Sequence, residues 1–143
     1  MNEVINENFE RKQTVFILGK DGEKHVEELK KNLHGLQLEE WNNQNDMKWK
    51  DDFEIRVNQK DTDRVNKIVL IRGINEFFLN EELTRFLTEA RRFNCWWWIV
   101  SESLAGINNE LLTIISGSAQ KVIIGEIGES DIEKATKFGW IQS

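Results

Sequence analysis

Residues 14–25 read TVFILGKDGEKH, and this stretch decides the fold class. Its first five residues form a short continuous apolar run, which is typical of a strand buried on both faces of a parallel sheet. A turn containing Gly19 and Gly22 follows, and Asp21 has the side-chain chemistry of a helix N-cap. A strand, a glycine-containing turn and a helix start are the elements on which nucleotide phosphates are commonly held. The stretch therefore predicts a nucleotide-binding type of α/β domain.

The turn lacks the groups that bind a phosphate. A loop of the form GxxxxGK[ST] uses glycines to point N–H groups inward, a lysine for the outer phosphates and a hydroxyl for magnesium. Counted from Gly19, Lys24 stands where the second glycine belongs and His25 where the lysine belongs. No Ser or Thr follows, and Asp21 and Glu23 add negative charge. We expect a vestigial nucleotide site without a cofactor, whose turn residues are Gly19, Lys20, Gly22 and Lys24.

Strands alternate with helices along the rest of the chain. Short apolar runs predict further strands over residues 36–41, 53–57, 67–72, 95–100 and 121–127. Apolar residues at helical spacing predict helices ending before Gly35 and over residues 79–92, 109–116 and 130–138. Ser130 and Glu133 form a capping-box pattern for the last helix, and Gly139 marks its end. This alternation predicts a three-layer α/β fold of the P-loop NTPase or Rossmann kind, with a mostly parallel sheet covered on both faces.

Length and composition fit one domain. The chain has 143 residues, 39% of them hydrophobic, which supports a single core of ordinary size. Residues 1–13 are polar and without period, so we expect a flexible N-terminal arm. The predicted α/β domain then spans residues 14–143.

Charge and cysteine content narrow the class of protein. The chain carries 25 acidic and 19 basic side chains, a net charge of −6, which disfavours nucleic acids and anionic membranes as partners. Cys95 is the only cysteine, so no internal disulfide forms, and a reducing compartment is expected. The sequence shows no signal peptide and no apolar run of the roughly 18 residues that a membrane helix needs. A cytoplasmic location without membrane insertion is predicted.

The predicted strand ends are poor in catalytic groups. Ligands of such sheets bind beyond the carboxyl ends of the strands, where phosphoryl transfer needs an acid to hold magnesium. Arg72 stands in that place, and a cation repels a metal ion. Ser101 ends a later strand, while Glu76 and Glu102 are candidate general bases that we interpret as solvated or paired. We therefore predict neither catalytic residues nor a metal site.

Six tryptophans accompany a complete absence of tyrosine and proline. Residues 96–98 are three consecutive tryptophans on a predicted strand, so two rings face one side of the sheet and one faces the other. We interpret these rings as core. Trp41, Trp49 and Trp140 lie in or beside polar segments, and we predict that they are exposed and contact a protein partner.

Three stretches of the second half resemble FtsK-like ATPases, and among them the type VII secretion ATPases. These stretches are KIVLIRGINEFF (67–78), LTRFLTEARRFNCWWWIVSES (83–103) and KVIIGEIGESDIEKATKFGW (121–140), while TVFILGKDGEKH aligns with the Walker A strand and turn. The resemblance places Lys24 and His25 at the nucleotide-binding lysine, Arg72 at the Walker B aspartate and Ser101 near the sensor. It implies the fold and a degenerate domain that recognises or assembles proteins. The implied partner is a larger ATPase, another secretion subunit or a second copy.

Two other functions stay open. Residues 14–41 also look like the opening of TIR-type domains, which implies protein interaction or NAD cleavage, with Glu102 and Glu89 as the candidate glutamates. The other is a domain that binds ATP weakly. A response-regulator receiver fits poorly, because Gly19, Arg72 and Gly125 stand where its acids and lysine belong.

Overall fold

A computed structural model describes residues 14–33, 35–41, 67–76, 81–93 and 95–141. The strands are β1 (Val15–Leu18), β2 (Gln37–Trp41), β3 (Lys67–Arg72), β4 (Cys95–Ser101) and β5 (Gln120–Ile123). The α-helices are α2 (Gly22–Lys30), α4 (Glu81–Glu89), α5 (Asn109–Ser118) and α6 (Glu129–Lys137), with short 3₁₀ turns at η1 (Ile74–Glu76) and η2 (Ala90–Phe93). All five strands are parallel and lie in the order β2-β3-β4-β1-β5.

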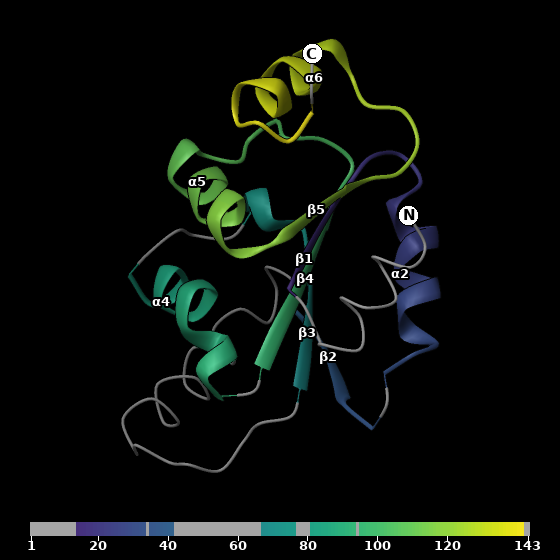
Figure 1. Ribbon diagram of the computed structural model, residues 1–143, viewed down its shortest axis with the longest axis vertical. Helices are drawn as coiled ribbons and strands as arrows, with labels where there is room; N and C mark the ends of the chain where they lie inside the picture. The colour runs from purple at the N-terminus through teal and green to yellow at the C-terminus, as the bar shows by residue number, and fades with distance from the viewer. Residues whose placement is uncertain (1–13, 34, 42–66, 77–80, 94, 142–143) are drawn as a thin grey trace.

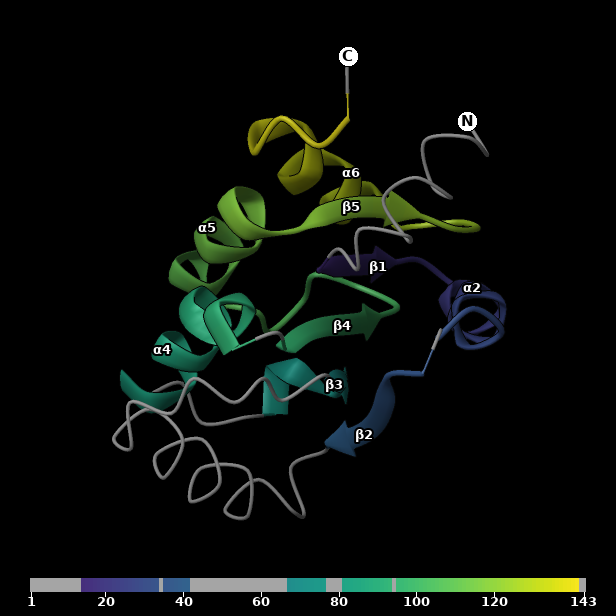
Figure 2. The ribbon, with the colours of Figure 1, turned by 60° about the horizontal axis from the view of Figure 1, so that its bottom comes forward.

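Helices cover both faces of this sheet, which confirms the predicted three-layer α/β fold (Figures 1 and 2). On one face α2 packs through Val26 and Leu29. On the other face α4, α5 and α6 share a larger core, to which α5 contributes Leu112 and Ile115. Because β1 lies between β4 and β5 and is buried along its whole length, its run of apolar residues is explained by contact on both faces.

The three consecutive tryptophans belong to the core, as predicted. Trp97 faces α4, whereas Trp96 and Trp98 face the α2 side, in agreement with the alternation along a strand. Trp97 and Trp98 are fully buried, and Trp96 is half-buried. The indole N–H of Trp97 donates a 2.9 Å hydrogen bond to the carbonyl of Leu87. That carbonyl lies in the last turn of α4, where carbonyl groups need partners from outside the helix.

Most predicted element boundaries hold within a few residues, and two details of the last strand and helix are wrong. β5 ends at Ile123 rather than at residue 127. Gly128 is the N-cap of α6, so Ser130 lies within the helix and does not cap it. Gly139 has φ +80° and ends the helix as predicted, with its N–H donating to Thr136. The predicted arm at 1–13 and strand at 53–57 lie outside the described residues.

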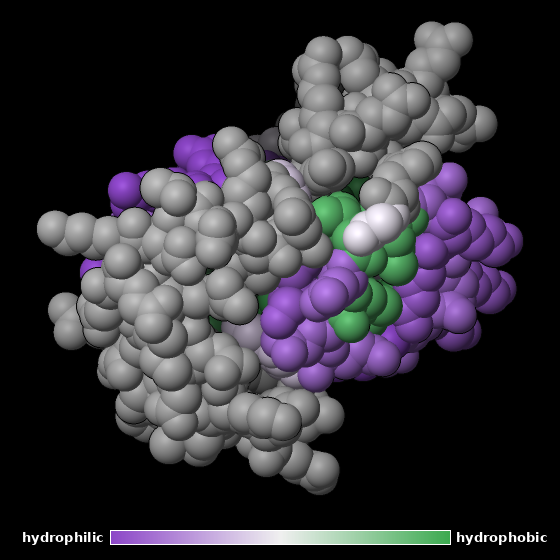
Figure 3. Space-filling model, turned by 90° about the horizontal axis from the view of Figure 1, so that it is seen from below, coloured by the Kyte–Doolittle hydropathy of each residue, from purple (hydrophilic) through white to green (hydrophobic). Residues whose placement is uncertain are grey.

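The surface of the described part of the chain is mostly hydrophilic on the side shown in Figure 3, where hydrophobic side chains gather in one small area. Among the helices of the described segments, none combines the length and the apolar character needed to cross a bilayer.

Candidate functional site

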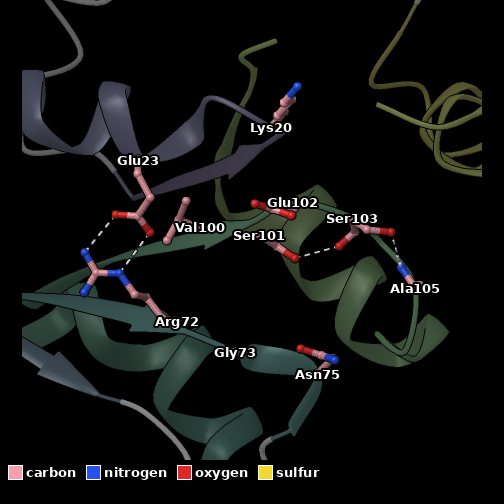
Figure 4. Close-up of a pocket in the computed structure, with 11 residues that line it drawn as sticks. Lys20, Glu23, Arg72, Gly73, Asn75, Val100, Ser101, Glu102, Ser103 and Ala105 are labelled. Atoms are coloured by element: carbon pink, nitrogen blue, oxygen red, sulfur yellow. Dashed lines mark hydrogen bonds and ion pairs between the residues drawn. The ribbon is translucent and has the colours of Figure 1, made fainter. Parts of the chain in front are cut away.

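A pocket lies where two adjacent strands send their helices to opposite faces. β1 continues into α2, which crosses one face to reach β2, whereas β4 continues into α5, which crosses the other face to reach β5. Crevices at such positions are the usual ligand sites of open α/β sheets. Here an open pocket of about 440 Å³ occupies this position (Figure 4). It is lined by Gly19, Lys20, Glu23, Arg72, Gly73, Asn75, Val100, Ser101, Glu102, Ser103 and Ala105.

The backbone N–H groups of the turn after β1 are already occupied. Those of Gly19, Lys20 and Asp21 donate to backbone carbonyls at 3.0, 3.2 and 3.1 Å. Their acceptors are the carbonyls of Ser101, which ends β4, and of Glu126 and Ile124, which follow β5, respectively. The N–H groups of Gly22 and Lys24 donate to the carbonyls of Gly19 and Asp21 within the turn itself. Since a phosphate loop works through N–H groups that point at the ligand, this turn has the shape of such a loop without its donors.

The glycines of the turn serve packing. Gly19 has φ +127°, and a Cβ at this position would stand 2.2 Å from the carbonyl oxygen of Ile124. A Cβ on Gly22 would lie 3.0 Å from a methyl carbon of Val100. Glycine is therefore required where the turn meets the exit of β5 and is favoured where α2 meets the sheet.

Arg72 lies between two carboxylates. Its Nε and one terminal nitrogen each lie 2.9 Å from the carboxylate oxygens of Glu23, and its other terminal nitrogen binds Glu40. These hydrogen bonds raise the pKa of Arg72, and the bond to Arg72 is the main cause that lowers the pKa of Glu23. The guanidinium thus joins α2, β2 and β3, and its three nitrogens are all engaged by protein acids. It neither holds a metal nor stands free for a phosphate.

The Arg72 cluster predicts a small pH dependence of stability. Because the folded-state pKa of Glu23 lies below the ordinary 4.5, its contribution is present above pH 4.5 and is lost as the pH falls through the folded value. We expect Glu23→Gln to remove this part of the acid sensitivity, with an effect below about 1 kcal/mol because the pair is partly exposed. Denaturant unfolding from about pH 3 to about pH 7, the range in which carboxylates titrate, measures this change in unfolding free energy. Glu28→Gln is the control, and an equal change there would contradict the prediction.

The loop after β4 is held by a buried acid that the sequence reasoning missed. Asp131 of α6 is only 5% exposed, and its Oδ1 accepts from the Ser103 hydroxyl at 3.1 Å and from the Leu104 N–H at 3.0 Å. The Ser101 hydroxyl donates to the Ser103 carbonyl at 2.6 Å. One signal for Asp131 exists in the sequence, because it shares the buried side of α6 with Ala135 at helical spacing.

Of the six residues predicted to form the vestigial site, four line the pocket and two do not. Gly19, Lys20, Arg72 and Ser101 all line the pocket, although the Lys20 ammonium points away from Arg72 (Figure 4). Lys24 does not line it, and its ammonium lies exposed, 4.0 Å from Asp21. Gly22 does not line the pocket either; it is the first residue of α2, next to the pocket.

The tryptophans predicted to be exposed are not free surface groups where the structure describes them. Trp41 is 6% exposed, and its ring lies 4.7 Å from that of Phe86, so the prediction of an exposed ring is wrong. Trp140 is half-buried against the core, and its indole N–H donates to the Ser116 hydroxyl at 2.5 Å. Trp49 lies outside the described residues.

In the segments that the structure describes, no three His, Cys, Asp or Glu side chains lie close enough together to hold a metal ion. His25 is half-buried on α2, and burial lowers its pKa.

Comparison of the chain with models of protein families gives no match, and comparison with curated proteins gives none either. The site must therefore be interpreted from its own geometry.

Proposed function

We propose that this chain is a catalytically inactive, P-loop-like domain that acts through contacts with another protein. The observation that carries the proposal is the turn of residues 19–22, whose N–H groups donate to carbonyls of the protein. A phosphate would have to displace these bonds, and it would meet the Glu23 carboxylate beside them. Arg72, paired with two acids, provides no magnesium ligand.

The proposed setting is a secretion or translocase ATPase, in which this domain helps recognition or assembly. The setting rests on the resemblance of residues 67–78, 83–103 and 121–140 to FtsK-like ATPases. The proposed partner is a larger ATPase, another subunit of such a system or a second copy. Arg72 and Ser101, the last residues of β3 and β4, both line the pocket, and this arrangement supports the proposed setting at the level of the fold alone.

Calorimetry with ATP and ADP, each with and without magnesium, tests the proposal. We expect no heat of binding, no release of phosphate and no rise in Tm at millimolar nucleotide, because a bound ligand would stabilise the folded state. Amide resonances of residues 19–24 should not move. Micromolar affinity would contradict the proposal, and millimolar affinity confined to this turn would favour the weak ATP-binding alternative.

A second candidate function, NAD cleavage, rests on Glu102. This glutamate is exposed and lines the pocket together with Ser101 and Asn75. If the chain cleaves NAD, incubation with NAD should release nicotinamide, and Glu102→Gln should stop the release. Glu110→Gln, an exposed acid outside the pocket, should leave it unchanged. Absence of nicotinamide with the folded wild-type chain would remove this candidate.

A further inference from the structure

At the pocket where β1 and β4 end, acids outnumber cations by three to two once Glu40, which binds Arg72 from beside the pocket, is counted. Four charged residues line it: Lys20, Glu23, Arg72 and Glu102. The Lys20 ammonium points out of the group formed by the others (Figure 4). Arg72 is shared by Glu23 and by Glu40 next to the pocket, so that cluster carries one net negative charge. With Glu102, the charges that remain at the pocket favour a cation.

Glu102 is the acid in this pocket that the fold leaves unexplained. Among the described residues it makes no ion pair, whereas Glu23 binds Arg72. Glu110 and Glu129 are also exposed, but they lie in the first turns of α5 and α6, where the helix dipole favours an acid. Glu102 precedes α5 by several residues and gains nothing from that dipole. Glu102 is exposed and lines the pocket.

The neutral groups beside Glu102 complete a set of hydrogen-bond acceptors. The Ser101 hydroxyl gives its proton to the Ser103 carbonyl, so toward the pocket its oxygen accepts. The exposed Asn75 side chain adds an amide oxygen from the loop after β3. A guanidinium offers five donors in one plane and carries its charge at every pH of interest, so it matches a carboxylate flanked by neutral acceptors. The volume falls in the range of ligand pockets, roughly 300–1,000 Å³.

We propose that this pocket binds an arginine side chain of a partner polypeptide, with Glu102 as its carboxylate partner. The inference rests on the proposed function and deepens it, because it names the chemistry of the partner. In open α/β sheets that bind nucleotides, this position holds an anionic phosphate, whereas here it would hold a cation. A metal ion is a poorer occupant, because the described residues contain no group of three ligands.

Titration of the full ¹⁵N-labelled chain, followed by amide shifts, tests the inference with three probes. N-acetyl-arginine amide supplies the side chain, N-acetyl-citrulline amide has the same shape without the charge, and inorganic pyrophosphate tests for an anion. We expect the arginine amide to shift resonances of residues 73–75 and 101–105, with millimolar affinity. The citrulline amide should bind at least about threefold more weakly, because it lacks the charge for one exposed ion pair. Pyrophosphate should not shift the resonances of these residues.

Two variants separate the proposed contact from general surface charge. Glu102→Gln should lower the affinity for the arginine amide by about threefold or more, whereas Glu110→Gln should leave this affinity unchanged. Equal binding of both amides, equal affinity in Glu102→Gln, a stronger response to pyrophosphate, or no response of these residues to the arginine amide would each overturn the inference. None of these outcomes requires ATP binding. Micromolar binding of ATP would instead overturn the proposed function, so the two failures are distinguishable.

Discussion

Gly19→Ala is expected to destabilise the folded chain by about 3 kcal/mol or more, as forced left-handed backbone and a steric clash add together. The Cβ would stand 2.2 Å from the Ile124 carbonyl oxygen, in a backbone conformation with φ +127°. Neither atom belongs to a flexible side chain that can move aside. Urea unfolding followed by circular dichroism measures the loss of unfolding free energy.

Gly117→Ala is the matched control for this experiment. Gly117 lies within α5, and a Cβ there meets no atom within 4 Å. Alanine should therefore stabilise the helix by about 0.5–1 kcal/mol. Opposite signs for the two substitutions would show that close packing of the turn requires Gly19. A loss of less than about 1 kcal/mol for Gly19→Ala would contradict that explanation.

Trp97→Ala is expected to cost about 3–5 kcal/mol of unfolding free energy. The substitution removes a fully buried ring and leaves the Leu87 carbonyl, which accepts its N–H at 2.9 Å, without that donor. Trp96→Ala, on the same strand and half-buried, should cost clearly less. The comparison uses denaturant midpoints and slopes of both variants. Equal losses would contradict the assignment of Trp97 to the buried core and of Trp96 to a half-buried position.

The architecture was predictable mainly because the three central strands are apolar runs of the right length. The segments at 67–72 and 95–100 match β3 and β4 almost residue for residue, since burial on both faces leaves no polar residue between the two ends of each strand. The parallel sheet then brings strand ends together, which is why Arg72 and Ser101 could be placed at one site. The order of the strands could not be predicted, because it depends on which helix crosses which face.

The contacts that define the site join segments far apart in the chain. Glu23 and Glu40 lie 49 and 32 residues from Arg72. Their pairing depends on the positions of α2 and β2, which no local pattern contains. The prediction for Trp41 failed for a related reason. Its neighbours in the sequence are acidic or polar, yet its ring packs on Phe86 of α4. Polarity of flanking residues did not determine the burial of an aromatic side chain.

The occupied turn after β1 means that exchanging side chains alone would not create a phosphate-binding loop here. Counted from Gly19, the hydroxyl of a phosphate-binding loop would fall on Val26, which is fully buried between α2 and the sheet. His25→Lys with Val26→Ser would therefore place a hydroxyl in the core and leave the N–H groups of residues 19–21 bound to the exits of β4 and β5. A phosphate could use these donors only after the backbone hydrogen bonds of Gly19, Lys20 and Asp21 were broken, so the obstacle lies in the backbone and not in the side chains.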